Sequence, residues 1–403
     1  MNDSLMAYDP MRSPLFAKNI VATSQPLAAQ AGLNIMKVGG NAVDAAIATA
    51  ITLTVVEPTG NGLGSDAFAI VWDGKKLHGM NGSGKSPRAW TRKYFEKYRE
   101  MPQFGWDTIT VPGAVSSWVW LSDRFGKLPF ERLFEEAINY GDTGFHVGFR
   151  TAYDWNHGPE VWYSNYQAFV DEFMPAPKTG DLVVRPDVAK TLSEIAETKG
   201  ESLYRGNLAE KIEEASVLGG GGLRLGDLSE HQTETVELLS QSYRDILAYE
   251  IPPNGQGIAA LIALGILEKC DICEPGTIDS FHLQIEAMKI GLFLANRYVA
   301  DPNQMKLRPE ELLDDSILSR YAKKIGKKAL PTPPLDPFKG GDTVYLSACD
   351  ASGMMVSFIQ SNYFGFGSGI VIPETGIALQ NRGWGFTLEK GNPNEVGPRK
   401  KPF

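Results

Sequence analysis

The apolar positions near the N-terminus recur at helical spacing in two successive segments. Ser24 is a candidate N-cap for the first helix, and Gly39-Gly40 supplies its stop. Asn41, followed three positions later by Asp44, has the pattern of a capping box and predicts a second helix that ends at Glu57-Pro58. This second helix is so rich in alanine that we expect it to lie close against another layer of the fold.

A buried strand and a long helical region follow these two helices. The apolar run from Ala67 to Trp72 predicts the strand, with a hairpin turn at Asp73-Gly74. From Ala89 to about Phe338 the pattern is mostly helical, with capped segments at Pro129 to Tyr140 and Ile278 to Arg297.

The period of the pattern changes to two near the C-terminal end. A connector rich in proline and glycine between Lys327 and Gly341 should be exposed and extended. After it, alternation predicts a pair of strands at Val344 to Ala348 and Met355 to Gln360, and a second pair around a turn at Glu374-Thr375. Helices that lead into such antiparallel strands predict an α+β layer structure.

Composition and charge exclude several classes of partner. The 403 residues include 39 Lys and Arg against 48 Asp and Glu, a net charge of −9, which argues against nucleic acid. The longest apolar run, Gly257 to Leu267, is far shorter than the roughly 18 residues that cross a membrane. Met1 to Pro14 shows no export signal, and three cysteines are too few for a disulfide scaffold. We therefore expect a cytoplasmic protein with no membrane partner.

Several familiar site motifs are incomplete. Cys270 and Cys273 have the spacing of a metal half-site, but no second pair completes four-ligand zinc. Gly219 to Gly222 lacks the Gly-Lys pair of a phosphate loop, and Gly82-Ser83-Gly84 is not a serine-hydrolase elbow. The histidines lack metal-ligand spacing, so we expect each to be packed or at the surface, and we expect no metal. They are His78, His146, His157, His231 and His282.

The junction between the connector and the first of these late strands is the remaining candidate for chemistry. A threonine that opens a strand, as Thr343 does, is usually an ordinary β-former. Here it directly follows a Pro/Gly connector, which is the arrangement that a self-cleaving precursor needs. The Thr343 hydroxyl could attack the carbonyl of Asp342, and hydrolysis of the resulting ester would free Thr343 as a new N-terminus.

A freed N-terminal threonine would carry both its nucleophile and its base. The reference pKa of an α-amine is about 8, so a useful fraction of it is unprotonated near neutral pH. That amine can deprotonate the hydroxyl of the same residue. A hydrolase built this way needs neither a histidine partner nor a metal.

A set of motifs over most of the chain supports this hypothesis. The motifs are Thr23–Gln30, Gly39–Ala46, Val56–Pro58, Gly219–Leu228, His282 with Glu286, Asp301-Pro302, Thr343–Asp350, Gly367–Gly369 and Pro373–Leu379. Together they resemble the γ-glutamyltranspeptidase family of N-terminal nucleophile hydrolases, which includes cephalosporin-acylase-like members. None of the motifs would suffice singly.

The resemblance implies a fold and a reaction. The fold would be an αββα four-layer sandwich, cut before Thr343 into a large-subunit region, residues 1–342, and the start of a small-subunit region, residues 343–403. The two fragments would stay associated. Thr343 would accept a γ-glutamyl or related dicarboxylic acyl group from a small-molecule amide, as in glutathione metabolism, and pass it to water or an amine. The resemblance implies no cofactor.

The residues that bind substrate in the family are partly replaced. Ser83 stands where the family carries an arginine that grips the α-carboxylate of glutamate, and the acidic pair of the family falls on Trp384-Gly385. Ser361 stands where many members have an asparagine near the substrate. We take Ser361, Tyr363 and Arg382 as candidate pocket residues, and Arg382 could hold a substrate carboxylate that Ser83 no longer can.

The resemblance also implies that the chain stops before a Ser-rich loop and the Gly-Gly pair that supplies oxyanion contacts. Each lost oxyanion donor costs roughly 3 kcal/mol of transition-state stabilisation. The sequence would then be a fragment or a disrupted reading frame, or a partner chain would complete the fold, and part of the core would be exposed. A catalytically inactive relic with a structural or binding role is therefore the alternative to the enzyme.

Overall fold

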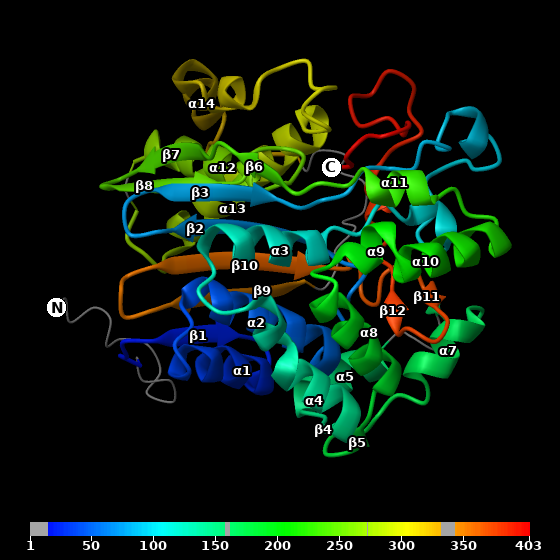
Figure 1. The fold of residues 1–403 in the computed structure, drawn as a ribbon. Coiled ribbons are helices and arrows are strands. Elements are labelled where there is room, and N and C mark those ends of the chain that lie inside the picture. The colour runs from blue at the N-terminus through cyan, green and yellow to red at the C-terminus, as the bar shows by residue number, and fades with distance from the viewer. Residues whose placement is uncertain (1–14, 158–161, 272, 332–342) are drawn as a thin grey trace.

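A six-stranded antiparallel sheet organises the computed structural model, which describes residues 15–157, 162–271, 273–331 and 343–403. Figure 1 shows the strands one above another, with the N-terminal strand lowest. In spatial order they are β1 (Ile20–Thr23), β9 (Val344–Cys349), β10 (Met355–Ser361), β2 (Asp66–Trp72), β3 (Leu77–Asn81) and β6 (Glu234–Val236).

The strand that follows Thr343 lies inside this sheet. β9 pairs with β1 through Thr23 opposite Leu346, and with β10 through Gln360 opposite Val344. On its other side β10 pairs with β2, which places Ser361 opposite Asp66. The strands predicted from the period-two pattern and the strand predicted at Ala67 to Trp72 are therefore confirmed, and the structure shows that they are neighbours in the sheet.

Two helices, α1 (Pro26–Lys37) and α2 (Ala42–Val56), cover one face of the sheet. Every residue of α2 is buried. Val344, Leu346 and Ala348 point into the same core as α2, while the intervening residues of β9 do not. The alanine-rich sequence of α2 thus permits close packing against the sheet, as expected.

The caps of these two helices were predicted with mixed success. Asn41 caps α2 as expected, since its side chain accepts from the amides of Val43 and Asp44, and the Asp44 carboxylate accepts from the Asn41 amide. The prediction of Ser24 as the first cap is wrong. Gln25 caps α1 instead, because the Ser24 hydroxyl donates to Glu57 Oε2 at 2.7 Å.

Replacing Asn41 by alanine should lower the free energy of unfolding by about 1 to 2 kcal/mol. The substitution removes the α2 cap and also the 2.6 Å hydrogen bond from Asn41 Nδ2 to the Phe125 carbonyl. Asn139→Ala, at an exposed position inside α4 (Glu135–Thr143), is the control and should change stability by less than about 0.5 kcal/mol. Urea unfolding measures both, and equal effects would reject this role of Asn41.

Further helices surround this core. The segment predicted from Pro129 to Tyr140 divides into a 3₁₀ turn, Phe130–Phe134, and α4. In Figure 1, α3 lies in front of the sheet, and it packs on β2. The helices after α2 in this part are α3 (Ala114–Phe125), α4, α5 (Phe149–Asn156), α7 (Gln167–Phe173), α8 (Pro186–Glu197), α9 (Glu201–Arg205), α10 (Asn207–Leu218) and α11 (Leu225–Ser229).

A second unit of strands and helices has its own apolar core. In this unit the hairpin of β7 and β8 packs on α12, and α12 packs on α13. The extent of α13 confirms the helix predicted from Ile278 to Arg297. The elements are β7 (Leu239–Tyr243), β8 (Ile246–Glu250), α12 (Ile258–Glu268), α13 (Ile278–Tyr298) and α14 (Asp315–Ala322).

The expectation of a mostly helical middle region is confirmed, although short strands also occur in it. It contains β6, β7 and β8 as well as the short pair β4 (Phe145–His146) and β5 (Leu182–Val183). These strands are short or largely exposed, so they carry little of the apolar alternation that marks a half-buried strand. The α+β class itself is confirmed. The predicted second late pair is also present as β11 (Val371–Ile372) and β12 (Ile377–Ala378).

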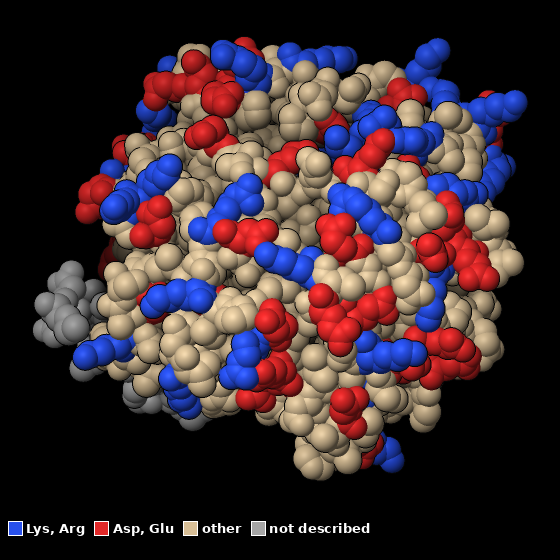
Figure 2. Space-filling model, in the orientation of Figure 1, with Lys and Arg blue, Asp and Glu red and all other residues tan. Residues whose placement is uncertain are grey.

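The surface combines exposed apolar and mixed charged regions. Tyr345, Met355 and Ile359, on the face of β9 and β10 opposite α2, are 40% to 52% exposed. On the face shown in Figure 2 the cationic and anionic side chains of the described residues are interspersed. Within the described ranges, the helices are all too short or too polar to cross a membrane.

Candidate active site

Thr343 lies at the start of β9 with its side chain next to that of Ser361. The two hydroxyl oxygens, Thr343 Oγ1 and Ser361 Oγ, are 2.9 Å apart. Thr343 is exposed, whereas Ser361, at the end of β10, is buried. The pairing of β9 with β10 thus places an accessible hydroxyl against a fixed one.

A backbone amide orients the Ser361 hydroxyl. Tyr363 N donates to Ser361 Oγ at 2.8 Å. An oxygen that accepts from this amide can direct its own O–H toward Thr343 Oγ1, since a hydroxyl has one donor and two acceptor sites. Ser361 can therefore donate a hydrogen bond to the Thr343 oxygen when negative charge develops on it.

A buried ion pair lies next to Ser361. Asp66 begins β2 and is 1% exposed, and its Oδ2 accepts from Arg382 Nε at 2.7 Å. Its Oδ1 accepts from the amides of Gly84 at 3.3 Å and Gly113 at 3.0 Å. Burial raises the pKa of Asp66, and the Arg382 guanidinium opposes that rise.

Aromatic rings enclose the guanidinium of Arg382. Its central carbon lies 5.6 Å from the Phe68 ring centroid and 5.4 Å from that of Tyr363. The Tyr363 ring in turn meets Trp384 edge to face. Burial raises the pKa of the Tyr363 hydroxyl, so this ring is neutral and offers a π-face to the cation.

The structure brings most of the predicted site residues together. The Ser361 hydroxyl contacts that of Thr343, the Tyr363 amide donates to Ser361, and the Tyr363 ring contacts the guanidinium of Arg382. Asp342 lies outside the described residues. Asp66 was missed by the sequence analysis, although a carboxylate that opens an otherwise apolar strand was a usable signal.

Ser83, which the sequence resemblance aligns with a substrate-binding arginine, forms hydrogen bonds within the fold. Ser83 is buried, and its hydroxyl approaches Asn81 Oδ1 at 2.7 Å and Asn254 Oδ1 at 3.0 Å. Asn254 Nδ2 also donates to the Pro402 carbonyl at 2.7 Å. Ser83 therefore helps to hold the chain beyond β3 and does not itself replace the lost cation.

The described residues contain no group of three or more His, Cys, Asp or Glu side chains placed to hold a metal ion. Cys270 Sγ donates to the Ile266 carbonyl, and Cys270 and Cys273 are free thiols. Gly219 to Gly222 lies between α10 and α11 and packs against Trp106.

The solved structures that the chain resembles are N-terminal nucleophile hydrolases, and the chain shares their α+β fold. Within that class, the chain belongs to the γ-glutamyltranspeptidase family. The family model described as Gamma-glutamyltranspeptidase matches residues 28–403. The family comprises hydrolases and acyltransferases, so the chain is an enzyme of this type, and nothing in the comparisons favours the inactive relic.

Individual relatives cover nearly all of this chain. The "glutathione hydrolase-like YwrD proenzyme" of Bacillus subtilis is 35% identical, over 97% of this chain and 76% of its own length. The "oxamate amidohydrolase proenzyme" of Klebsiella pneumoniae is 32% identical, over 94% and 73%. The crystal structure of a cephalosporin acylase from Bacillus halodurans is 44% identical with a TM-score of 0.92, over 98% and 76%.

Proposed function

We propose that this protein is an autoprocessed amide hydrolase or acyltransferase with Thr343 as its N-terminal nucleophile. The observation that carries the proposal is the 2.9 Å approach of the Thr343 and Ser361 hydroxyls at the start of a central strand. Cleavage between Asp342 and Thr343 divides the chain into a large-subunit region, 1–342, and a small-subunit region that begins with 343–403. The word proenzyme in the names of both relatives supports such processing.

The proposed cleavage needs no other reactant than water. Thr343 Oγ1 attacks the carbonyl carbon of Asp342, the C–N bond breaks, and the acyl group moves from nitrogen to oxygen as an ester. The hydroxyl proton passes to the departing nitrogen, which becomes an amine. Water then hydrolyses the ester, leaving a carboxylate on Asp342 and both a hydroxyl and an α-amine on Thr343.

The mature residue then carries out acyl transfer. The α-amine, with a reference pKa of about 8, takes the hydroxyl proton as Thr343 Oγ1 attacks the amide carbonyl of the donor. The same proton goes to the leaving amine, and an ester joins the acyl group to Thr343. Attack by water or by a second amine releases the product and restores the hydroxyl.

Arg382 favours a small-molecule donor with a carboxylate. Its Nε donates to Asp66, and its Nη1 and Nη2 atoms form no hydrogen bond with the described residues. A planar guanidinium in this state can still grip a carboxylate with its outer nitrogens. We therefore propose a dicarboxylic monoamide or a γ-glutamyl amide as donor, with the former favoured because Ser83 replaces the family arginine.

Sheet pairing supports continued association of the two fragments. β9, which follows the cut, pairs with β1, which precedes it, and β10 pairs with β2. Their side chains share one core with α2. Separation would break both ladders and expose that core, so we propose that the fragments separate only under denaturing conditions. A cytoplasmic location and a role in glutathione metabolism are further proposals, which fractionation and a glutathione turnover assay would test.

Intact-mass analysis combined with N-terminal sequencing tests the proposed function. Purified protein should give two fragments, the smaller one beginning Thr-Val-Tyr-Leu, and it should release the chromophore from glutaryl or γ-glutamyl anilide. A single uncut chain that hydrolyses neither donor would favour the inactive relic.

Replacing Ser361 by alanine should lower kcat/KM for the donor by about 100-fold, because the hydrogen bond to the nucleophile is lost. Ser357→Ala is the matched control on the same strand, since the Ser357 hydroxyl contacts Tyr345 Oη instead of Thr343. It should keep nearly full activity. Equal rates for the two variants would show that Ser361 does not assist Thr343.

A further inference from the structure

Three polar side chains of α13 hold the segment that leads toward the proposed cleavage bond. His282, Glu286 and Lys289 recur at helical spacing and therefore lie along one side of α13. Each bonds to a backbone atom of the segment that follows α14. We call these three residues the α13 anchor. His282 and Glu286 belong to the motifs in the sequence, and the proposed acyl transfer gives neither of them a role.

The α13 anchor binds both backbone polar groups of Leu330. Leu330 N donates to Glu286 Oε2 at 3.1 Å, and Lys289 Nζ donates to the Leu330 carbonyl at 2.7 Å. One turn earlier on the helix, His282 Nε2 donates to the Gly326 carbonyl at 2.7 Å. The Leu330 side chain also packs on the core that α12 and α13 share. The segment is therefore fixed at two points along α13.

The Glu286 carboxylate in this anchor is buried. Its side chain is 1% exposed and accepts from Lys289 Nζ at 2.9 Å and 3.2 Å. Burial by itself raises the pKa of Glu286, but the hydrogen bonds from Lys289 and from Leu330 N outweigh burial and lower it. A buried ion pair adds little stability compared with apolar packing of the same volume. What this pair adds is a defined place for the backbone of Leu330.

The anchored segment is the start of the connector to Thr343. Residues 331–342 separate Leu330 from Thr343, and all of them but the first lie outside the described residues. Proline fixes φ, so a chain rich in proline passes on the position of its first residue over several residues. At the far end, β9 is held between β1 and β10. The prolines of the connector are Pro331, Pro333, Pro334 and Pro337.

We propose that the α13 anchor positions the connector for self-cleavage, an inference that rests on the proposed function. Without the anchor, the chain before Thr343 is free back to the end of α14 at Ala322, about twenty residues instead of the twelve from 331 to 342. The probability that a flexible chain meets a fixed point falls with about the three-halves power of its length. The attack of Thr343 Oγ1 on the Asp342 carbonyl should therefore become about twofold slower.

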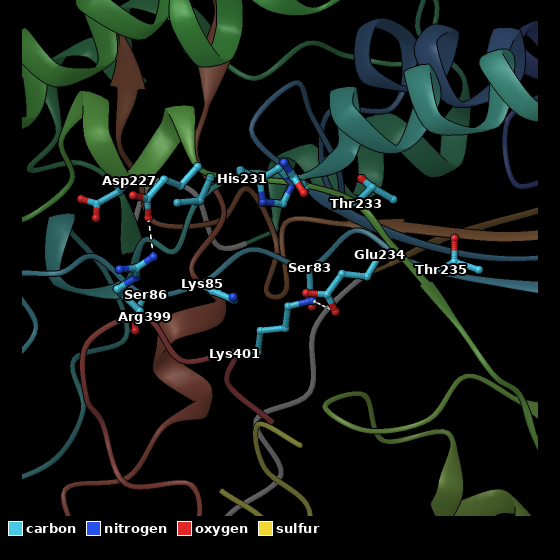
Figure 3. Close-up of a pocket in the computed structure, with 13 residues that line it drawn as sticks. Ser83, Lys85, Ser86, Asp227, His231, Thr233, Glu234, Thr235, Arg399 and Lys401 are labelled. Carbon is cyan, nitrogen blue, oxygen red and sulfur yellow. Dashed lines mark hydrogen bonds and ion pairs between the residues drawn. The ribbon is translucent and has the colours of Figure 1, made fainter. Parts of the chain in front are cut away.

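The α13 anchor lies apart from the residues that would bind a donor. Figure 3 shows a cavity of about 360 Å³ beside Ser83, and the described residues that line it include His231 and Lys401 but no member of the anchor. After the cut, the connector no longer joins Leu330 to Thr343. Substitutions in the anchor should therefore slow cleavage and leave the activity of cut molecules unchanged.

A time course of cleavage during cell-free synthesis tests this proposal. The double variant His282→Ala with Glu286→Ala should cut itself about twofold more slowly than the wild type, or slower still. Its kcat/KM per cut molecule should equal that of the wild type. Glu286→Gln alone keeps an oxygen that accepts from Leu330 N, so it should cut nearly as fast as the wild type. Asn296→Ala, at an exposed position of the same helix, is the matched control.

Two results would overturn the proposal. The first is a cleavage rate of the double variant equal to that of Asn296→Ala. The second is an equal fall in the cleavage rate and in kcat/KM per cut molecule, because damage to the fold as a whole would lower both.

Limited proteolysis of the uncut Thr343→Ala protein tests the anchor without any enzyme activity. Lys327 and Lys328 are exposed and lie within the held segment. Trypsin cuts such a segment when it opens locally. Adding the double substitution in the anchor should therefore speed trypsin cleavage after these lysines by about fivefold or more, because at least two hydrogen bonds are lost. Unchanged proteolysis would overturn the proposal.

The two experiments separate this inference from the proposed function. A wild-type chain that never cuts itself, combined with faster proteolysis of the anchor variant, would reject the proposed function and keep the anchor. A wild-type chain that cuts itself at Thr343, combined with anchor variants that behave as the wild type does, would do the reverse.

Discussion

Replacing Thr343 by alanine should leave a single uncut and inactive chain. The substitution removes the oxygen that would attack the Asp342 carbonyl, so no ester forms and no new N-terminus appears. Activity on glutaryl or γ-glutamyl anilide should fall by a factor of about 10⁴ or more, to background, because nucleophile and base disappear together. Denaturing electrophoresis and intact mass give the first readout, and chromophore release gives the second.

Thr343→Ser provides the control for this experiment. Serine keeps the hydroxyl and the prospective α-amine, so the variant should still cut itself at the same bond and should retain measurable turnover. The alanine variant should still unfold in one cooperative transition, which excludes misfolding as the reason for lost activity. Normal cleavage of Thr343→Ala would show that Thr343 is not the nucleophile that cuts the chain.

Replacing Arg382 by alanine should lower the free energy of unfolding by about 3 kcal/mol or more at neutral pH, because it leaves the Asp66 carboxylate buried without its ion-pair partner. Arg308→Ala, at an exposed site, should cost less than about 1 kcal/mol. The double variant Asp66→Asn with Arg382→Ala should recover part of the loss, since the asparagine is uncharged and can still accept from Gly84 and Gly113.

The loss caused by Arg382→Ala should shrink as the pH falls. Burial already raises the pKa of folded Asp66 above its ordinary 3.8, and removal of Arg382 raises it further. Between the unfolded and folded pKa values the folded state binds more protons, so stability decreases as the pH rises through that window. Urea unfolding should therefore show a smaller difference from wild type at about pH 4 than at about pH 7. A difference independent of pH would contradict the role assigned to Asp66.

A comparison of charged and uncharged acyl donors shows whether Arg382 binds the donor or only stabilises the fold. If Arg382 binds the donor carboxylate, the variant should lose more activity on glutaryl anilide than on an uncharged acyl anilide. An equal loss on both donors would show that Arg382 acts only through its pair with Asp66.

Strong local patterns made much of the fold predictable. The capping box at Asn41 and Asp44 fixed the start of α2, and period-two alternation located β9 and β10. Local patterns gave the wrong cap where a residue distant in the sequence supplied a competing hydrogen bond. The Ser24 hydroxyl donates to Glu57, and Gln25 caps α1 in its place. They failed again in β8, where exposure on both faces left no periodic signal.

By itself, the sequence singled out Thr343 as the candidate nucleophile, because this residue opens a strand directly after a Pro/Gly connector, whereas Ser361, Tyr363 and Arg382 became candidate pocket residues only through the resemblance to the family. Only the tertiary structure paired Asp66 with Arg382, and Thr343 with Ser361. These partners lie up to 316 residues apart in the chain, as Asp66 and Arg382 do. Their meeting depends on how the strands order themselves in the sheet, and no local pattern of residues encodes that order.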